Sequence, residues 1–242
     1  MRNSTNDFEY VEFSETRKLL NHSDFDRNRP TVVYGYGYTE KYTSLSTQTV
    51  VLSFIDRRDY NVLVVSWSNY SNGKYALEAI PNAQKVGQIV GKVLIAMREQ
   101  GFNLENFHLV GHSLGAHLVG YIGRSVYKNS NERFKISRIT ALDPSGVLFF
   151  GLPAMLTEPL RKNDGIFVDA IHTDSTFFGT RSNVGHADFW PNEGKNQPEC
   201  PLATLDINSE QSIFLHSNHC SRNFQIQIQR FLFSSSFMGI LF

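Results

Sequence analysis

The chain has 242 residues, 41% of them hydrophobic, and this length and composition suit one α/β domain with a full core. Lysine plus arginine and aspartate plus glutamate both number 23, so the formal net charge is zero, which argues against a nucleic-acid partner. No apolar run approaches the roughly 18 residues of a membrane span, so no transmembrane segment is expected. The first residues, MRNSTNDFEY, have no apolar core, and we expect no secretory signal in the sequence as given.

Strand and helix patterns alternate from residue 31 onward. Residues 1–30 are polar and predict an irregular or edge segment. TVVY at 31–34 predicts a short strand that ends in the glycine-rich GYGYTE. NVLVVSW at 61–67 is almost continuously apolar, which is typical of a strand buried on both faces.

A helix is predicted over residues 81–100, because Pro81 suits a helix start and Gly101 suits the position just past a helix end. Its apolar residues recur at helical spacing and share one predicted face: Val86, Ile89, Val90, Val93, Leu94 and Met97.

Three more strands and one more helix follow. We expect strands at 107–111, 136–142 and 166–172, and a helix at 114–127. Strands that alternate with helices of this length predict a mostly parallel sheet with crossover helices. In such a sheet, functional residues gather at the carboxyl ends of the strands.

One serine lies between two glycines at the end of a predicted strand, in Gly111-His112-Ser113-Leu114-Gly115. A sharp strand-to-helix turn of this kind lifts the serine hydroxyl out of the backbone, and the glycines make room for the turn. A serine nucleophile also needs a base, a group that orients the base, and N–H donors for the oxyanion. The alternative is a serine that only caps a helix.

Five segments resemble the animal pancreatic-lipase family: VVYGYGYTE, GHSLGAH, TALDPSG, FVDAIHTD and GHADFWPNEGKNQPEC. The resemblance runs from about residue 30 to about residue 224, and the block at 185–200 is its most specific part. The family includes triacylglycerol lipases, phospholipases A1 and insect yolk proteins. The resemblance implies an α/β-hydrolase fold with helices on both faces of a mostly parallel central sheet, secretion, and hydrolysis of acyl esters in lipids.

The acid that orients the base is expected to be Asp143. It follows the predicted strand 136–142 and matches the family's catalytic aspartate. Asp169 and Asp174 are rivals, but Asp169 lies inside a predicted strand rather than at its end. An Asp-Pro pair that only starts a turn is the simpler alternative.

The oxyanion donors are expected to be the backbone N–H groups of Leu114 and Tyr38. Tyr36-Gly37-Tyr38 stands where the resemblance implies His-Gly-aromatic, so Tyr36 replaces a histidine. Since the donor is a backbone group, this replacement need not abolish the oxyanion hole. The alternative is a flexible glycine loop.

The predicted base is His219, within HSNHCSR at 216–222. The family pattern is Cys-(Ser/Asn)-His-X-Arg, and this chain matches it only with a shift. Alignment on Asn-His selects His219, whereas alignment on Cys-Ser places Arg222 where the histidine belongs and implies an inactive enzyme. We favour His219, because the chain order Ser113, Asp143, His219 is that of α/β-hydrolases. His216 is the second candidate, and an ordinary loop histidine is the alternative.

The resemblance also implies a disulfide between Cys200 and Cys220 and a short lid at about 201–218 between them. No CxxC pattern occurs, so we expect no metal site, and a structural calcium of some relatives is left open. We expect a polar segment at 1–30 and a single α/β-hydrolase domain at 31–242, without the C-terminal β-sandwich domain of many relatives.

These features predict a secreted, extracellular lipid carboxylester hydrolase of the triacylglycerol lipase or phospholipase A1 type. Its substrate would be an acylglycerol or phospholipid at an interface, and it would need no cofactor. The alternative is a non-catalytic lipid-binding or yolk-type storage protein of the same fold. Ser113 favours the enzyme, and the shifted histidine motif favours the storage protein. A cytosolic non-lipid serine hydrolase would fit the serine motif but not the block at 185–200.

Overall fold

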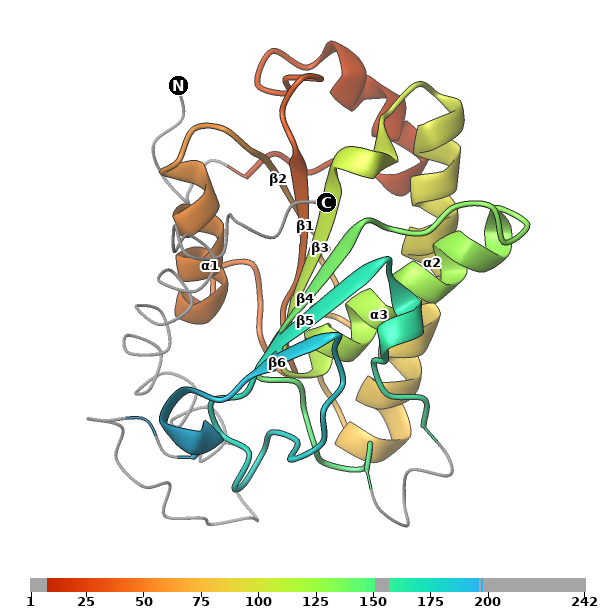
Figure 1. Ribbon diagram of the computed structural model, residues 1–242. Coiled ribbons are helices and arrows are strands. Elements are labelled where there is room, and N and C mark those ends of the chain that lie inside the picture. The colour runs from red at the N-terminus through yellow and green to blue at the C-terminus, as the bar shows by residue number, and fades with distance from the viewer. Residues whose placement is uncertain (1–7, 151–156, 196, 198–242) are drawn as a thin grey trace.

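A parallel β-sheet forms the centre of the molecule. The computed structural model describes residues 8–150, 157–195 and 197, and within them six strands pair in the order β2-β1-β3-β4-β5-β6 (Figure 1). All five neighbouring pairs are parallel. The strands are β1 (Thr31–Gly35), β2 (Asn61–Val64), β3 (Phe107–His112), β4 (Arg138–Leu142), β5 (Phe167–Ile171) and β6 (Ala187–Phe189). The predicted α/β-hydrolase fold class is confirmed.

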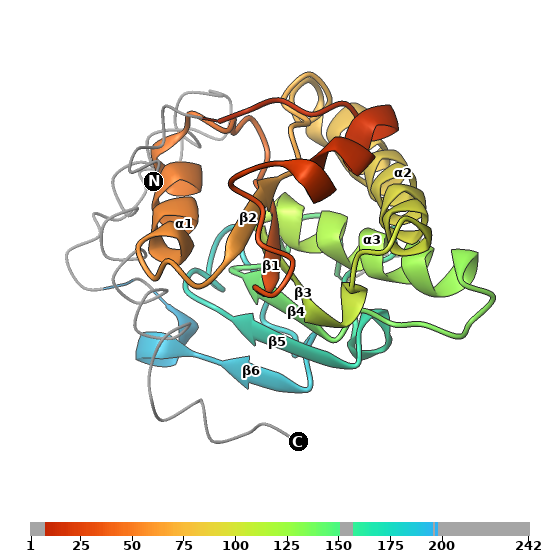
Figure 2. The same cartoon turned by 90° about the horizontal axis from the view of Figure 1, so that it is seen from above.

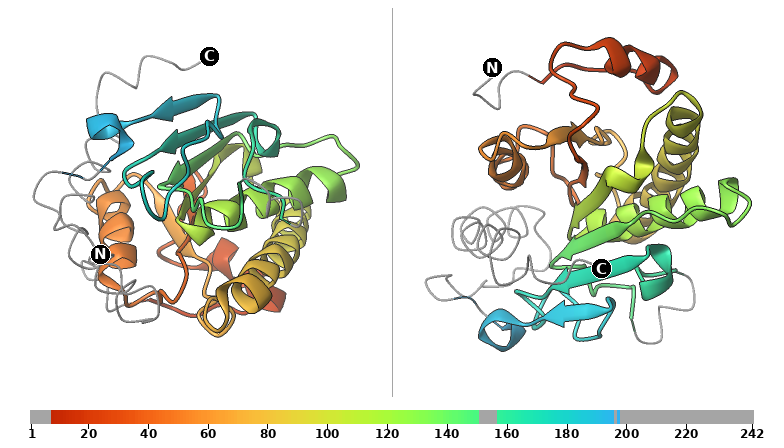
Figure 3. Two further views of the ribbon diagram at one scale, coloured as in Figure 1. Left: turned by 90° about the horizontal axis from the view of Figure 1, so that it is seen from below. Right: turned by 45° about the horizontal axis from the view of Figure 1, so that its top comes forward.

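Helices cover both faces of the sheet. They are α1 (Leu45–Ile55), α2 (Ile80–Glu99) and α3 (Leu114–Asn129). Seen from above, α1 lies on one side of the sheet, and α2 and α3 lie on the other (Figure 2). Figure 3 shows the same division from two further directions. The described residues also form five shorter helical segments: the 3-10 helices η1 (Phe13–Asn21), η3 (Leu104–Asn106), η5 (Lys162–Asp164) and η6 (Pro191–Gly194) and the π-helix η2 (Tyr75–Ala79).

One part of the core lies between the sheet and α3, which contacts β1, β3 and β4, and buried residues of α1 and α2 add to the core. Leu114, Leu118 and Ile122 of α3 are fully buried, and all five residues of β1 are buried. A central parallel strand is covered on both faces, which is why the apolar runs at 31–34 and 107–111 were readable as strands.

The buried face of α2 differs from the predicted one. Ile89 was predicted to share the apolar face of this helix with Val86 and Val90, which are buried, but it is 50% exposed. Gly87 and Gly91 are buried in its place, because α3 approaches α2 closely there. A Cβ added at Gly87 would lie 2.5 Å from Cβ of Tyr121, and one at Gly91 would lie 2.4 Å from Cβ of Ser125. The side of α2 that carries the two glycines therefore faces α3, and Ile89 lies outside this contact.

The predicted strand at 61–67 is shorter and less buried than expected. β2 ends at Val64, three of its four residues are only half-buried, and it is the end strand of the described sheet. After Val65, the chain leaves the sheet, and the backbone N–H of Trp67 donates to the Tyr36 hydroxyl. An apolar run does not by itself tell a central strand from an end strand.

Among the described α-helices and strands, α1 and β6 were not predicted from the sequence. Helix α1 is rich in β-branched and hydroxyl residues, which have low helix propensity, but it buries one side in the core. Strand β6 has only three residues, too few for a periodic pattern.

Candidate active site

Ser113 occupies a strained turn between β3 and α3. Its φ is 53° and its ψ is −119°, outside the regions that residues with a side chain usually adopt. Its N–H donates to the carbonyl of Leu142 at 2.9 Å, which ties the turn to the end of β4. Such strain persists only where the surrounding structure imposes it, and it concentrates at functional sites. The expected strand-turn-helix around Ser113 is therefore present.

Gly111 and Gly115 allow three backbone segments to meet at this turn. A Cβ added at Gly111 would lie 2.2 Å from the carbonyl oxygen of Gly115. One added at Gly115 would lie 2.1 Å from the carbonyl oxygen of Gly35, at the end of β1. Both obstacles are backbone atoms, so no side-chain rotation could relieve the clash. The start of α3 thus packs directly on the end of β1.

Replacement of Gly115 by alanine is expected to lower the free energy of unfolding by about 3 kcal/mol or more, because α3 must move away from β1. Urea unfolding followed by circular dichroism would measure this. Gly101→Ala is the matched control. Nothing lies within 4 Å of an added Cβ there, so only its φ of +101° opposes alanine, at a cost of about 1–2 kcal/mol. Equal losses in the two variants would contradict the close approach.

The loop that was expected to supply an oxyanion donor lies beside Ser113. A Cβ added at Gly37 would be 3.1 Å from Cβ of Ser113 and 3.3 Å from the carbonyl oxygen of His112. Tyr38 follows directly in this loop. Leu114 is the first residue of α3, where backbone N–H groups have no acceptor within the helix. Both proposed donor residues are therefore next to the serine turn.

Aromatic contacts hold the loop in place. Trp67 donates its backbone N–H to the Tyr36 hydroxyl at 2.6 Å and its indole N–H to the Tyr36 carbonyl at 3.2 Å. The two rings stack with centroids 6.1 Å apart. The Tyr38 hydroxyl donates to the carbonyl of Gly73 at 2.5 Å, and its ring meets Tyr75 edge-on at 5.0 Å. These contacts argue against a flexible glycine loop and show what Tyr36 does in place of a histidine.

Asp143 follows the last residue of β4 and is anchored by the segment after β5. Its Oδ1 accepts hydrogen bonds from the N–H groups of Thr173 at 2.9 Å and Asp174 at 3.1 Å. Its own N–H donates to the carbonyl of Ile171 at 2.7 Å. Burial raises the pKa of Asp143 above its ordinary value, and the two N–H donors offset this only in part. The carboxylate is thus held at the carboxyl edge of the sheet, one strand from Ser113.

The rival Asp169 has a structural role within the sheet. It lies inside β5 and is almost fully buried. Its Oδ2 accepts from the Arg138 guanidinium at 2.5 Å and its Oδ1 accepts from the Thr140 hydroxyl at 2.6 Å. The expectation that Asp169 lies within a strand and Asp143 at a strand end agrees with these positions.

His117, one turn into α3, supports packing. Its Nε2–H donates to the carbonyl of Ser145 at 2.8 Å, and its Nδ1 accepts from the N–H of Leu160 at 3.0 Å. Its ring stacks on Phe149 with centroids 3.6 Å apart. Burial lowers the pKa of His117 to about 3, so the ring is neutral. Both ring nitrogens are engaged by backbone groups, which leaves neither for proton transfer.

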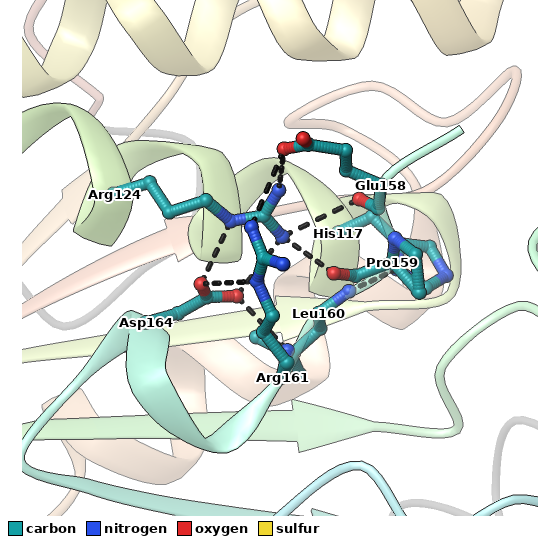
Figure 4. A network of polar contacts seen from close by, with 7 residues as sticks. All are labelled: His117, Arg124, Glu158, Pro159, Leu160, Arg161 and Asp164. Atoms are coloured by element: carbon teal, nitrogen blue, oxygen red, sulfur yellow. Dashed lines mark hydrogen bonds and ion pairs between the residues drawn. The ribbon is translucent and has the colours of Figure 1, made fainter. Parts of the chain in front are cut away.

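Arg124 of α3 binds the segment 158–164, which lies against this helix (Figure 4). The sequence did not indicate this contact. Its Nε donates to Asp164 Oδ1 at 2.7 Å, and another guanidinium nitrogen contacts Glu158 Oε2 at 2.7 Å. Asp164 is almost fully buried, so its charge needs this partner. The helix that begins beside Ser113 is thereby tied at Arg124 to the segment 158–164.

His172 is buried and directly precedes Thr173, one of the two residues that anchor Asp143. Its Nε2 pairs with Asp188 Oδ1 at 2.7 Å, and its ring stacks on Trp190 with centroids 3.8 Å apart. Asp188 also accepts from the N–H groups of Val184 and Gly185. These contacts join the FVDAIHTD and GHADFW segments and give them a structural role next to the site.

Glu40 is a buried carboxylate near the serine that sequence reasoning did not single out. Its Oε2 accepts from the N–H of Gly37 at 2.5 Å and from His112 Nδ1 at 3.2 Å. Its Oε1 accepts from the Ser46 hydroxyl. The side chain is only 9% exposed. The available signal was a lone carboxylate inside the glycine-rich GYGYTE segment, whose fold the sequence does not show.

The Glu40–His112 pair has shifted pKa values of opposite sign. Burial alone would raise the pKa of Glu40, but His112, Ser46 and Gly37 outweigh it and hold the pKa below the ordinary 4.5. Burial alone would lower the pKa of His112, but Glu40 and, less strongly, Asp143 hold it above the ordinary 6.5. The charged forms of both groups are therefore favoured by the fold.

This pair is expected to make stability depend on pH. The contribution of Glu40 is present above pH 4.5 and is lost as the pH falls through its lower folded value. That of His112 is present below pH 6.5 and is lost as the pH rises through its higher folded value. The difference in unfolding free energy between wild type and Glu40→Gln should therefore be largest between these two values. Urea unfolding across pH would measure it, and a difference that grows above pH 7 would contradict the assignment.

The remaining predicted residues lie outside the described part of the chain. These are the base His219, its alternative His216, Cys200, Cys220 and the lid at 201–218. Their positions and roles stay predictions. In the described ranges, no three His, Cys, Asp or Glu side chains gather as they would around a metal ion. Nor does any helix there have the length and apolar character needed to cross a membrane.

Comparison with known proteins decides the family. Residues 1–238 match the protein family described as Lipase. The chain belongs to the lipase family. Lipase member H-A of Xenopus laevis is 35% identical over 198 residues, covering 79% of this chain and 41% of that protein. Pancreatic lipase-related protein 2 of Rattus norvegicus is 34% identical over 245 residues, covering 95% of this chain and 50% of that protein. This lipase-family chain thus spans half or less of the length of these relatives, and the predicted family resemblance is confirmed.

Similar solved structures include an α/β hydrolase from a deep-sea metagenome library, with a TM-score of 0.39 and 16% identity over 62% of this chain and 58% of that one. A sugar hydrolase from Lactococcus lactis has a TM-score of 0.43 and 15% identity over 84% of this chain and 92% of that one.

Proposed function

We propose that this lipase-family chain is a lipid carboxylester hydrolase that acts through Ser113, Asp143 and His219. The observation that carries the proposal is the strained backbone of Ser113 at the β3–α3 turn, with the Gly37–Tyr38 loop beside it. A serine that only capped α3 would need neither the strained backbone nor the neighbouring loop. Moreover, the Ser113 side chain makes no capping hydrogen bond.

In this mechanism Ser113 Oγ attacks the acyl carbonyl, and His219 takes the hydroxyl proton and later gives it to the leaving alcohol. Asp143 holds the imidazole in the required tautomer. The N–H groups of Leu114 and Tyr38 donate hydrogen bonds to the oxyanion. Water then releases the fatty acid, and no cofactor takes part.

The proposed substrates are acylglycerols or phospholipids at an interface, and the proposed location is extracellular. A disulfide between Cys200 and Cys220 and a short lid at 201–218 are parts of the proposal that family membership supports. A short lid covers less of the acyl site, so a bulky polar head group fits, which favours phospholipase A1 activity. Hydrolysis of a triacylglycerol but not of a phospholipid would contradict the proposed phospholipase A1 activity.

A second candidate is a non-catalytic lipid-binding or storage protein of the same fold. The observation that favours it is the shifted motif HSNHCSR at 216–222, in which histidine and cysteine do not both match the family spacing.

Labelling with a fluorophosphonate separates the two candidates. The reagent modifies a serine only where nucleophile, base and oxyanion hole are assembled. We expect modification at Ser113, loss of labelling in His219→Ala, and normal labelling in the matched control His216→Ala, mapped by mass spectrometry. A folded wild type that resists labelling would support the storage protein.

A further inference from the structure

Glu40 joins three segments that meet at the serine turn. It lies two residues after Tyr38 in the loop that follows β1. Through Ser46 it contacts the first turn of α1, and through His112 it contacts the last residue of β3, directly before Ser113. Through the N–H of Gly37 it folds back onto its own loop. One carboxylate therefore links the loop of the predicted oxyanion hole to the segment that carries the serine.

The hydrogen bond to the N–H of Gly37 holds the loop residue directly before Tyr38, the predicted oxyanion donor. At 2.5 Å it is a charge-assisted N–H···O⁻ bond, stronger than a bond between neutral groups. The position of a Cβ at Gly37 is already 3.1 Å from both Glu40 Oε2 and Ser113 Cβ. Gly37, the residue directly before Tyr38, is thus confined between the carboxylate and the serine.

A carboxylate suits this position better than a neutral side chain. Both of its oxygens accept hydrogen bonds, from an N–H, a hydroxyl and a ring nitrogen. Burial of an ionised group is unfavourable unless several donors surround it, and here three do. A glutamine of the same shape would replace one acceptor oxygen by an NH₂ group, for which only the Ser46 hydroxyl could act as acceptor. It would also lose the charge that strengthens the bonds from Gly37 and His112.

We propose that Glu40 is a positioning residue, which holds the Gly37–Tyr38 arm of the oxyanion hole in register with Ser113. This role rests on the proposed hydrolase function. Glu40 does not touch the substrate, and it acts through the Gly37 N–H and through His112. Its loss displaces a transition-state donor rather than a binding surface, so kcat falls and KM changes little.

The experiment compares wild type, Glu40→Gln, Glu40→Asp and the control Glu105→Gln, which changes an exposed glutamate remote from the loop. Kinetics with a soluble p-nitrophenyl butyrate substrate give kcat and KM, well below the melting temperature of every variant. We expect Glu40→Gln to lose roughly tenfold to a hundredfold in kcat, with KM little changed. Glu40→Asp keeps the charge and should recover part of the loss, and Glu105→Gln should match the wild type.

Ser46→Ala provides a milder variant if Glu40→Gln does not fold. It removes one donor from the carboxylate and should lower kcat several-fold without a change in KM. Wild-type kcat in both Glu40→Gln and Ser46→Ala would overturn the positioning role, as would a loss of activity that only follows a loss of folded protein. A wild type that neither turns over the ester nor labels at Ser113 would instead overturn the proposed function itself.

Discussion

Replacement of Ser113 by alanine is expected to reduce kcat for ester hydrolysis by a factor on the order of 10⁶, the loss found when the nucleophile of a serine hydrolase is removed. Fluorophosphonate labelling should disappear as well. The reason is that alanine has no hydroxyl to attack the acyl carbonyl, while the N–H groups around the turn remain. The φ of 53° is as unfavourable for alanine as for serine, because both carry a Cβ, so the variant should be about as difficult to hold in this turn.

The matched control for this variant is Ser182→Ala, at an exposed serine in the loop between β5 and β6. It should keep wild-type kcat and labelling. Circular dichroism and a melting curve would show that Ser113→Ala is folded. Residual turnover of Ser113→Ala near the wild-type level would mean that another residue attacks the ester, and the site proposed at the β3–α3 turn would be wrong.

Replacement of Asp143 by asparagine is expected to lower kcat by about 10⁴, because an amide no longer fixes the correct tautomer of the base. The change is nearly isosteric, and the amide oxygen can still accept from the N–H groups of Thr173 and Asp174. Since burial already raises the pKa of Asp143, loss of its charge should cost little stability. The effect should therefore fall on kcat, measured with a soluble ester, rather than on folding.

Asp169→Asn is the control for this second variant, because Asp169 is the rival acid on the neighbouring strand. Its pair with Arg138 is broken by the change, so the free energy of unfolding should fall while kcat of the folded protein stays near the wild-type value. The reverse pattern, with activity lost in Asp169→Asn and kept in Asp143→Asn, would exchange the two assignments.

The features that the sequence by itself determined are those that short segments encode. The apolar runs at 31–34 and 107–111 became β1 and β3, because strands buried on both faces need an unbroken run of apolar side chains. The spacing of Gly111, Ser113 and Gly115 indicated the turn, because only glycine tolerates the contact between α3 and β1. The position of Asp143 at the carboxyl end of a strand was predicted in the same way, because it directly follows the segment that became β4.

Other features depend on contacts between segments far apart in the chain, and only the tertiary structure decided them. The order of the strands and the end position of β2 follow from pairing, which no local pattern records. Ile89 is exposed because Gly87 and Gly91 turn another side of α2 toward α3. Glu40 contacts His112 across 72 positions of the chain, so its burial and its three donors became visible only once β1 and β3 lay side by side.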